Sequence, residues 1–503
     1  MFAQTLNHGM ICKDGRSIAR ARSVIASLIA SLLAACVSAP PSSDTVVLSV
    51  IGTNDVHGEF AAQHGGLVAL SGYVAALRAQ RAQDGAVLLL DGGDMWQGTL
   101  ESNLNEGAAV VQAYTALAYD AATIGNHEFD FGPVGASAIP EAEGDNPRGV
   151  LQTRSAEAGF PLLAANIIDD ATGAPVAWTN VQPAVLIERA GIKIGIVGVT
   201  TAETLETTIA ANTVGLSIAP LAPTIERHAK DLRARGARLV FVVSHAGGHC
   251  REAGDPQDLS SCDLDAEIFA VARELPAGLV DHIVAGHHHR PMAHEVNGIA
   301  ITSNPSSARS FGRVDFEFDR AQGAVLRRTI HPPTTVCLFT HTDSHTCASA
   351  DEPGAKPVSY AGRVVRPLPA VVAIADGANA RAQVVKAEPL GVVLETAVTL
   401  EGGPFSALGR LMTDATREAT GADVAVHNVV GGLRADLPAG PLTFGDVYRM
   451  FPFDNRLSLL QVTVADLTTL LAYQVHHTSL RVTSRRISPA SHCTCISTPD
   501  TPT

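Results

Sequence analysis

The sequence has little positive charge, no apolar run long enough to cross a bilayer and no cysteine pair with zinc-binding spacing. Its formal net charge of −14 disfavours a nucleic-acid polymer as partner, because few cations are left to displace counterions from phosphates. No Cys-x-x-Cys or Cys/His spacing that would close a structural zinc site occurs. An apolar content of 46% over 503 residues is typical of an enzyme with two or more domains. An anionic substrate would therefore be held locally, by bound divalent cations and a few arginines.

The first 43 residues have the composition of a targeting signal and a tether. Basic residues precede an apolar run at 24–35, which is the layout of a secretory signal and too short to span a bilayer. The run ends in Leu-Ala-Ala-Cys, which resembles the bacterial lipobox. We therefore expect a lipid anchor at Cys36 and a periplasm-facing position in the cell envelope, on the outer membrane. The alternative is an ordinary signal peptide with an incidental Cys36.

The cysteines outside the leader form three locally spaced couples: Cys250 with Cys262, Cys337 with Cys347, and Cys493 with Cys495. An oxidising compartment suits the first two couples as loop-closing disulfides. The alternatives are free thiols or a zinc site, and the spacing disfavours zinc.

Short apolar runs rich in β-branched residues predict buried strands at 46–51, 87–90, 192–199, 239–243 and 283–285. Helix-like segments lie between them, for example at 66–83 and 108–118. Such alternation predicts an α/β layered domain, in which ligands bind where loops leave the carboxyl ends of strands. Potential metal ligands stand at these places: Asp55, His57, Asp94, His245 and His287.

Composition divides the chain further. We expect a leader at 1–43, the α/β domain at 44–327, a linker or insertion rich in Pro, Thr, Ser and His at 328–369, and a second, mixed α/β domain at 370–475. Residues 476–503 show no periodicity and are expected to be an atypical tail.

Carboxylate and amide oxygens mixed with imidazole nitrogens, without thiolates, are the ligands of a hydrolytic two-metal centre. Two such ions, roughly 3.5 to 4 Å apart, commonly share one carboxylate. Asp94 is the expected bridge, because Gly92 and Gly93 let the backbone turn before it. The alternative for Asp94 is a simple turn aspartate.

Further ligands are expected around this bridge. Asp55 and His57 alternate on an extended segment, so both can face one ion; an Asx turn and a surface histidine are the alternatives. Asn126 offers an amide oxygen to the second ion. His127, oriented by Asp130, can protonate the leaving alkoxide or stabilise the transition-state charge.

The triple histidine at 287–289 adds two more candidates. By the same alternation, His287 and His289 face the metals and His288 faces away. A solvated loop is the alternative. His249 lies in a glycine-rich loop and is expected to be exposed rather than a ligand.

With these motifs the chain resembles the 5'-nucleotidase branch of the calcineurin-like metallophosphoesterases, over roughly residues 46–472. The resemblance implies a four-layer αββα sandwich with a smaller α/β (α+β) substrate-binding domain. It also implies two divalent ions, for which Mn, Zn, Co and Mg are all candidates. The residues that it implies are Asp55, His57, Asp94 and His289 on one ion, Asp94, Asn126, His245 and His287 on the other, and His127 with Asp130 as the catalytic dyad.

The second domain resembles the family's nucleoside-binding domain at 431–436 and 451–454. The resemblance implies that Asn428 and Arg434 bracket a glycine-rich loop and that Phe453 stacks on the base. A planar guanidinium suits an anionic or polar group, and an aromatic ring suits a base. A surface arginine and a core phenylalanine are the alternatives. The family's asparagine stands five residues before the arginine, where this chain has Val429, and the domain is expected to be incomplete.

The expected function is metal-dependent release of phosphate from nucleotides, of the 5'-nucleotidase type. Alternative substrates on the same site are 2',3'-cyclic nucleotides, UDP-sugars and sulfur compounds. A lipoprotein that binds metal or nucleoside without turnover is the alternative of another class. His127 and Asp130 favour the enzyme, because a binding protein needs no proton donor.

Overall fold

The computed structural model describes residues 44–503 except 62–64, 342–345, 430–431, 454, 477–479, 485–492 and 498–503. The described residues from Val46 onward belong to one compact unit. The expected signal, lipobox and tether at 1–43 lie outside the described residues. So do Gly431 and Asp454, which belong to the two segments, 431–436 and 451–454, that resemble a nucleoside-binding domain. In the part that is described, no helix has both the length and the apolarity to cross a bilayer.

The first large sheet has seven strands, in the order β16-β15-β1-β2-β3-β4-β7. From β1 to β7 neighbouring strands pair in parallel, and β15 pairs with β16 antiparallel. The strands are β16 (Ala324–Thr335), β15 (Ser310–Asp319), β1 (Thr45–Thr53), β2 (Gly85–Asp91), β3 (Ala121–Thr123), β4 (Leu162–Leu163) and β7 (Val181–Gln182).

The second large sheet has six strands, in the order β13-β14-β12-β11-β9-β8. Its four central strands are parallel and its edge strands antiparallel. The strands are β13 (Met292–Val296), β14 (Ile299–Ser303), β12 (His282–Ala285), β11 (Leu239–His245), β9 (Ile192–Thr200) and β8 (Ala184–Arg189). A small separate sheet consists of β5 (Ile167–Asp169), β6 (Ala174–Pro175) and β10 (Leu216–Ile218).

The central strands are apolar on both faces because both faces are buried. In β11, Leu239 and Phe241 belong to the core between the two sheets, whereas Val240 and Val242 belong to the core under the helices. Alternation along a strand sends successive side chains to opposite faces, so a continuous apolar run fills two cores at once.

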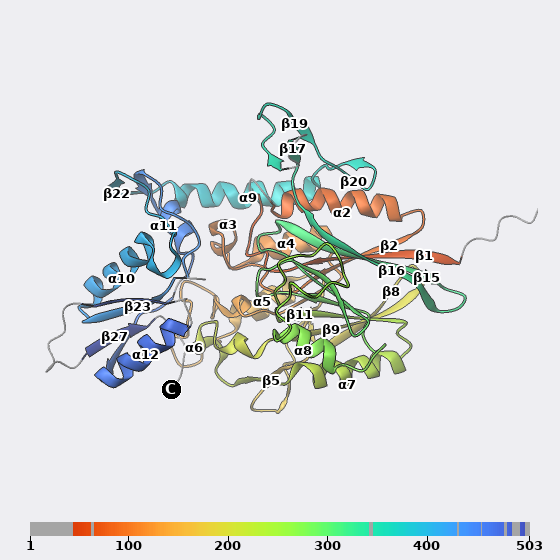
Figure 1. The fold of residues 1–503 in the computed structure, drawn as a ribbon, viewed down its shortest axis with the longest axis horizontal. Coiled ribbons are helices and arrows are strands. Elements are labelled where there is room, and N and C mark those ends of the chain that lie inside the picture. The colour runs from red at the N-terminus through yellow and green to blue at the C-terminus, as the bar shows by residue number, and fades with distance from the viewer. Residues whose placement is uncertain are drawn as a thin grey trace, which may run out of the picture. The chain divides into compact units, whose positions relative to one another are not determined.

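Helices cover the two outer faces. On the first sheet lie α2 (Leu67–Arg81), α4 (Ala108–Leu117), α5 (Gly149–Glu157) and the start of α9 (Pro369–Lys386), and on the second lie α7 (Leu221–Ala234) and α8 (Glu267–Glu274). Figure 1 shows α2 and α9 on one side of the strands and α7 and α8 on the other. The four-layer αββα arrangement is therefore confirmed. Short helices occur at α3 (Leu100–Asn103), η1 (His127–Phe129), η2 (Ala202–Leu205) and α6 (Ala210–Thr213).

The segment expected as a linker or insertion is partly sheet. Residues 328–335 lie in β16 and pair with β15. Short strands follow at β17 (Phe339–His341), β18 (Cys347–Ala348), β19 (Ala355–Pro357), β20 (Ser359–Tyr360) and β21 (Arg363–Val364). Tyr73 of α2 fixes this segment, since its hydroxyl donates to the carbonyl of Cys337 at 2.9 Å and accepts from the same residue's N–H.

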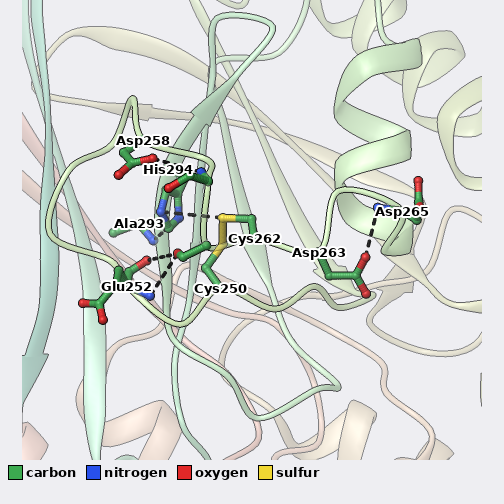
Figure 2. The surroundings of a disulfide bond; sticks show 10 residues. Cys250, Glu252, Asp258, Cys262, Asp263, Asp265, Ala293 and His294 are labelled. Carbon is green, nitrogen blue, oxygen red and sulfur yellow. Dashed lines mark hydrogen bonds between the residues drawn. A yellow bond between two sulfur atoms is a disulfide. The ribbon is translucent and has the colours of Figure 1, made fainter.

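Both expected disulfides form. Cys250 pairs with Cys262 and Cys337 pairs with Cys347. Figure 2 shows the first of them, with His294 beside Cys262 at an Nε2–Sγ distance of 3.8 Å. A histidine beside two cysteines matches a metal set in composition, but sulfurs bonded to each other cannot serve as thiolate ligands.

The second domain has a sheet in the order β25-β27-β23-β26 and the pair β22-β24. Its elements are β22 (Pro389–Leu394), η3 (Gly403–Phe405), α10 (Ala407–Thr420), β23 (Val424–Asn428), β24 (Gly440–Thr443), α11 (Phe444–Met450), β25 (Ser458–Val462), α12 (Val464–His476), β26 (Leu480–Ser484) and β27 (Cys493–Ser497). The last two lie in the expected tail, yet both pair with β23. Both strands are therefore part of this domain's sheet.

We predict that Cys250→Ser lowers the free energy of unfolding by about 2–4 kcal/mol, because the bridge restricts the unfolded chain. Urea denaturation of the oxidised protein measures this. Cys262→Ser on the Cys250→Ser background should add little, since the bridge is already lost. Additive losses from the two substitutions would contradict a disulfide.

Candidate metal centre

The candidate ligands meet where the two sheets place the carboxyl ends of their parallel strands. Asp55 and His57 follow β1, Asp94 follows β2, Asn126 follows β3, His245 ends β11 and the His287–His289 segment follows β12. The pairing of β1 with β2 brings their following loops to the same edge, since the last residues of the two strands, Thr53 and Asp91, lie opposite each other. The loops are then joined directly, because the Asp55 N–H donates to the Gly93 carbonyl at 2.9 Å.

Backbone conformation, rather than strand alternation, aims these side chains. β1 ends at Thr53, so the expectation of alternation on an extended segment is wrong for Asp55 and His57. Five candidate ligands have left-handed φ values: Asp55 (51°), His57 (52°), Asp94 (56°), His287 (75°) and His289 (54°). A left-handed backbone conformation costs a non-glycine residue on the order of 1–3 kcal/mol of conformational free energy, and residues in this conformation cluster at functional sites.

Gly93 shows how tightly the loops pack. Its φ is +91°, and a Cβ there would meet His245 Nδ1 at 2.9 Å and the Gly125 nitrogen at 3.0 Å. Only glycine meets both the conformation and the space. The glycine before Asp94 thus lets three ligand-bearing loops touch.

Asp55, His57 and His289 form the first group of ligand atoms, all within 4.8 Å of one another. The Nε2 atoms of His57 and His289 lie 3.1 Å apart, and His289 Nε2 lies 3.4 Å from Asp55 Oδ1. His57 Nδ1 lies 2.9 Å from the Gln97 carbonyl. Because a carbonyl only accepts, Nδ1 carries the proton and the lone pair of Nε2 faces the group.

Asp94 joins this first group to a second group of ligand atoms, which come from Asn126, His245 and His287. Its Oδ2 lies 4.0 Å from His57 Nε2 and 3.3 Å from His245 Nε2. His245 Nε2 also lies 2.9 Å from Asn126 Oδ1 and 3.2 Å from His287 Nδ1. All seven predicted ligands are therefore brought together, with Asp94 between the two sets.

The electrostatics of the site centre on two buried carboxylates. Burial raises the pKa of Asp55 and Asp94, but the charges and hydrogen bonds of the surrounding histidines, chiefly His289 for Asp55 and His245 for Asp94, together hold both pKa values below the ordinary range. Burial lowers the pKa of His245, yet Asp94 and Asp55 raise it to about 10. His57 has its pKa lowered to about 3, by burial and by His289. Two buried anions thus require positive charge between them, which is what a cation site provides.

His127 and Asp130 form a hydrogen-bonded pair beside the ligand groups. His127 Nδ1 lies 2.6 Å from Asp130 Oδ2, and its ring centroid lies 5.3 Å from that of His57. Burial lowers the pKa of His127, but Asp130 and Asp94 more than offset this and raise it overall. The predicted dyad is therefore assembled with one ring nitrogen fixed on a carboxylate.

Glu128, which sequence reasoning left without a role, joins two ligand loops. Its Oε2 accepts from the N–H groups of Asp94 at 2.9 Å and Gly125 at 2.7 Å, and its Oε1 accepts from Met95 at 2.7 Å. Burial and the charge of Asp94 raise its pKa to about 8. Its place in the Gly-Asn-His-Glu motif was the signal that could have identified it.

Asn54 and Asn304 support the Asp55 side chain: Asn54 contacts its carboxylate, and Asn304 fixes Asn54. Asn54 Nδ2 donates to Asp55 Oδ2 at 2.6 Å and to the Asn304 carbonyl at 2.9 Å, and Asn54 Oδ1 accepts from the Asn304 N–H. Asn304 follows β14, at the carboxyl end of a strand that sequence reasoning did not find. Its sequence surroundings carry no other signal.

Two residues of the second domain face this centre. The Arg434 guanidinium carbon lies 5.2 Å from the centroid of the Phe453 ring, and that ring lies 5.8 Å from His127. Arg434 is close enough for its charge to act on both His57 and His127, as a smaller influence on their pKa values than burial. Gln97 Nε2 donates to the Pro452 carbonyl at 2.6 Å, directly beside Phe453. Arg434 and Phe453 thus both lie beside the candidate metal ligands and the His127–Asp130 pair.

Other candidates lie apart. Asn428 ends β23 with an exposed side chain, which makes no hydrogen bond among the described residues. His288 is exposed and lies at the rim, with its ring centroid 5.4 Å from that of His287. His249 is partly buried and belongs to none of the ligand groups in the described part of the chain.

Comparison with known proteins finds relatives over most of the chain. The family model of the 5'-nucleotidase C-terminal domain matches residues 390–486. A 5'-nucleotidase of Vibrio cholerae is 28% identical over 492 residues, which cover 91% of this chain and 80% of the relative. The protein UshA of Escherichia coli is 27% identical over 84% of this chain and 74% of its own length.

The chain is thus similar to 5'-nucleotidases over most of its length, and residues 390–486 match their C-terminal domain. The predicted enzyme class, a metal-dependent phosphoester hydrolase, is confirmed with it. The fold agrees: the solved structure of a 5'-nucleotidase precursor from Thermus thermophilus superposes with a TM-score of 0.61 at 22% identity, over 87% of this chain and 81% of that one. Similarity to 5'-nucleotidases is consistent with divalent metal ions, and the residue groups described above are candidates to hold them.

We predict that Asp94→Asn lowers the content of bound metal together with the hydrolytic rate, because an amide supplies no negative charge between the two histidine groups. Elemental analysis of the purified protein measures the metal. Asp84→Asn is the control, since it removes only the exposed partner of Arg81. Full metal occupancy in Asp94→Asn would contradict its central position.

Proposed function

We propose that this chain is a two-metal phosphohydrolase that releases phosphate from nucleotides. The observation that carries the proposal is the placement of a histidine–carboxylate dyad beside two groups of converging ligands and an arginine–aromatic pair. The ligand groups would bind cations, the dyad would supply a proton, and the arginine–aromatic pair would hold the nucleotide.

The residues present fit divalent cations. Imidazole, carboxylate and amide donors without thiolate suit Mn²⁺, Zn²⁺, Co²⁺ or Mg²⁺. The proposed sets are Asp55, His57, Asp94 and His289 for one ion and Asp94, Asn126, His245 and His287 for the other. Ions bound there would neutralise phosphate oxygens and lower the pKa of an attacking water.

His127 is the proposed proton donor to the leaving oxygen. Asp130 is a carboxylate and only accepts, so His127 Nδ1 carries its proton towards Asp130 and Nε2 is left for the substrate. The same ring can stabilise charge that develops on the phosphate. Asp130 acts through His127 by fixing the ring's tautomer and direction.

Arg434 and Phe453 are the proposed nucleotide-binding residues. A guanidinium offers a planar fork of donors to an anionic or polar group, and it lies over the ring of Phe453. The ring can stack on a base once the substrate enters. Asn428 is proposed as a third contact from its place before the same loop.

For location we propose a lipid anchor at Cys36 and a periplasm-facing position on the outer membrane. The proposal rests on the basic and apolar stretches of the leader and on the Leu-Ala-Ala-Cys sequence that ends it. Two disulfides support an oxidising compartment. The mature chain should therefore stay with the membrane.

The test of the function is phosphate release from AMP, with an aryl phosphate ester, a 2',3'-cyclic nucleotide and a UDP-sugar beside it. The purified chain is assayed with added Mn²⁺ or Zn²⁺. Turnover of AMP supports the proposal. Turnover of the aryl ester alone would show hydrolysis without nucleotide binding, and no turnover of any substrate would favour a binding protein.

We predict that His127→Gln lowers kcat for AMP by about 10²–10⁴-fold, because the proton donor is lost. Metal content should stay at the wild-type level, since His127 is not a proposed ligand. His249→Gln is the matched control and should keep wild-type kcat. An unchanged kcat in His127→Gln would rule out the assigned role.

We predict that Cys36→Ser releases the protein from the membrane fraction when it is expressed with its leader, because the acylated residue is lost. Fractionation and immunoblotting measure this. Cys12→Ser, in the same leader, should leave the distribution unchanged. A membrane-bound Cys36→Ser variant would refute the anchor.

A further inference from the structure

Residues 201–208 follow β9 and supply none of the proposed metal ligands or the dyad. This stretch contains η2, which begins after Thr201, whose side chain accepts from the Glu203 N–H. It starts beside a ligand, because the Thr201 N–H donates to the His245 carbonyl at 2.9 Å. The carboxyl end of β9 thus adjoins the site, although neither the ligand sets nor the dyad draws on it.

Three contacts run from this segment to three different site residues. Glu203 Oε2 lies 3.0 Å from His287 Nε2. Asn126 Nδ2 donates to the Thr207 carbonyl at 3.0 Å. The third contact is the Thr208 hydroxyl, which donates to Asp130 Oδ1 at 2.8 Å.

The contact with Asn126 decides which end of its amide faces the ligand group. The NH₂ group is bound to a carbonyl, which only accepts, so the oxygen must point the other way. That oxygen lies 2.9 Å from His245 Nε2. An amide held in this direction presents the atom that a cation can bind.

The contact with His287 decides which ring nitrogen is free. Glu203 accepts from Nε2, so the proton stays there and the lone pair remains on Nδ1. Nδ1 lies 3.2 Å from His245 Nε2, inside the second group. Carboxylates bound to the outer nitrogen of a ligand histidine orient the ring and increase its basicity.

The contact with Asp130 completes the dyad's support. Asp130 uses Oδ2 for His127 and Oδ1 for Thr208, so both oxygens are occupied and the carboxylate cannot rotate freely. Thr208 is itself buried. The orientation of His127 therefore depends on a hydroxyl that acts on it only through Asp130.

Hydrogen bonds within the segment and to the end of β9 hold its backbone together. The Glu203 carbonyl accepts from the N–H groups of Glu206 and Thr207 and from the Thr207 hydroxyl at 2.7 Å. The buried hydroxyls of Thr200 and Thr204 lie 2.6 Å apart and tie η2 to the end of β9. Its three contacts are thus set by one short folded unit.

We propose that residues 201–208 are a positioning segment for both the second metal site and the catalytic dyad, with Glu203 acting on His287 and Thr208 acting on Asp130. This inference rests on the proposed function. It assigns positioning roles, since both side chains act through other residues of the site. It also specifies Nδ1 as the atom through which His287 binds metal.

The first experiment measures metal affinity of the metal-free full chain, by competition of Zn²⁺ or Mn²⁺ with a chromophoric chelator. Glu203→Ala should weaken the second binding step by about 10–100-fold, because the ring of His287 loses its orienting partner. Glu203→Gln should recover most of the affinity, since its amide oxygen still accepts from Nε2. Glu206→Ala is the control, an exposed glutamate of the same segment, and should bind metal as the wild type does.

The second experiment separates binding from turnover. Thr208→Val should lower kcat for AMP by about 10-fold or more with metal affinity unchanged, and Thr208→Ser should restore kcat because it restores the hydroxyl. Circular dichroism and thermal unfolding check that each variant is folded. A general loss of structure would lower affinity and kcat together and would not be reversed by the conservative substitutions.

The outcomes distinguish this inference from the proposed function. A wild-type chain that binds metal and hydrolyses AMP, with Glu203→Ala and Thr208→Val indistinguishable from it, would overturn the inference alone. If Glu203→Ala weakens metal binding and Glu203→Gln does not restore the affinity, the assigned role of Glu203 would also be overturned. A wild-type chain that binds no metal would overturn the proposed function and this inference with it.

Discussion

The rest of the structure depends on two buried carboxylates, Asp55 and Asp94, that stand beside each other at the ends of adjacent strands. Like charges in a buried place repel strongly, so they are held only where positive charge is supplied between them. His245 and His289 face them for this reason, and divalent cations would meet the same demand better. The hydrogen bonds of Glu128, Asn54 and Asn304 then fix the loops against that repulsion.

The two-sheet architecture is what allows such a centre to form. Parallel strands of each sheet end at the same edge, and the shared core between the sheets brings those edges together. Asp55 and Asp94 come from one sheet, and His245 and His287 come from the other. The second domain adds Arg434 and Phe453 at this edge. Gln97 connects the two parts, since its carbonyl accepts from the candidate ligand His57 and its amide donates to the Pro452 carbonyl.

Much of this could be predicted from sequence because the ligand motifs are local. The strands expected at 46–51 and 239–243 are observed as Thr45–Thr53 and Leu239–His245, and the ligands follow or end them. The expectation that Asp55 and His57 face one ion because they alternate on an extended strand was wrong. Left-handed backbone conformations direct their side chains instead. Composition suggested that residues 328–335 begin a linker or insertion, but they belong to β16, the edge strand that pairs with β15. Such pairing between two segments leaves no signal in the local composition.

The sequence by itself determined the chemistry of the centre: which donor types are available, which follow apolar strands, and that a histidine with a nearby aspartate accompanies them. Only the tertiary structure decided how each donor is presented. Glu203 contacts the candidate ligand His287, Thr208 contacts Asp130 of the dyad, and Asn304 contacts Asn54, all from distant segments. The tautomer of His287 and the direction of the Asn126 amide follow from such contacts. Residue type sets what an atom can bind, but its direction depends on hydrogen bonds that exist only after distant strands have packed together.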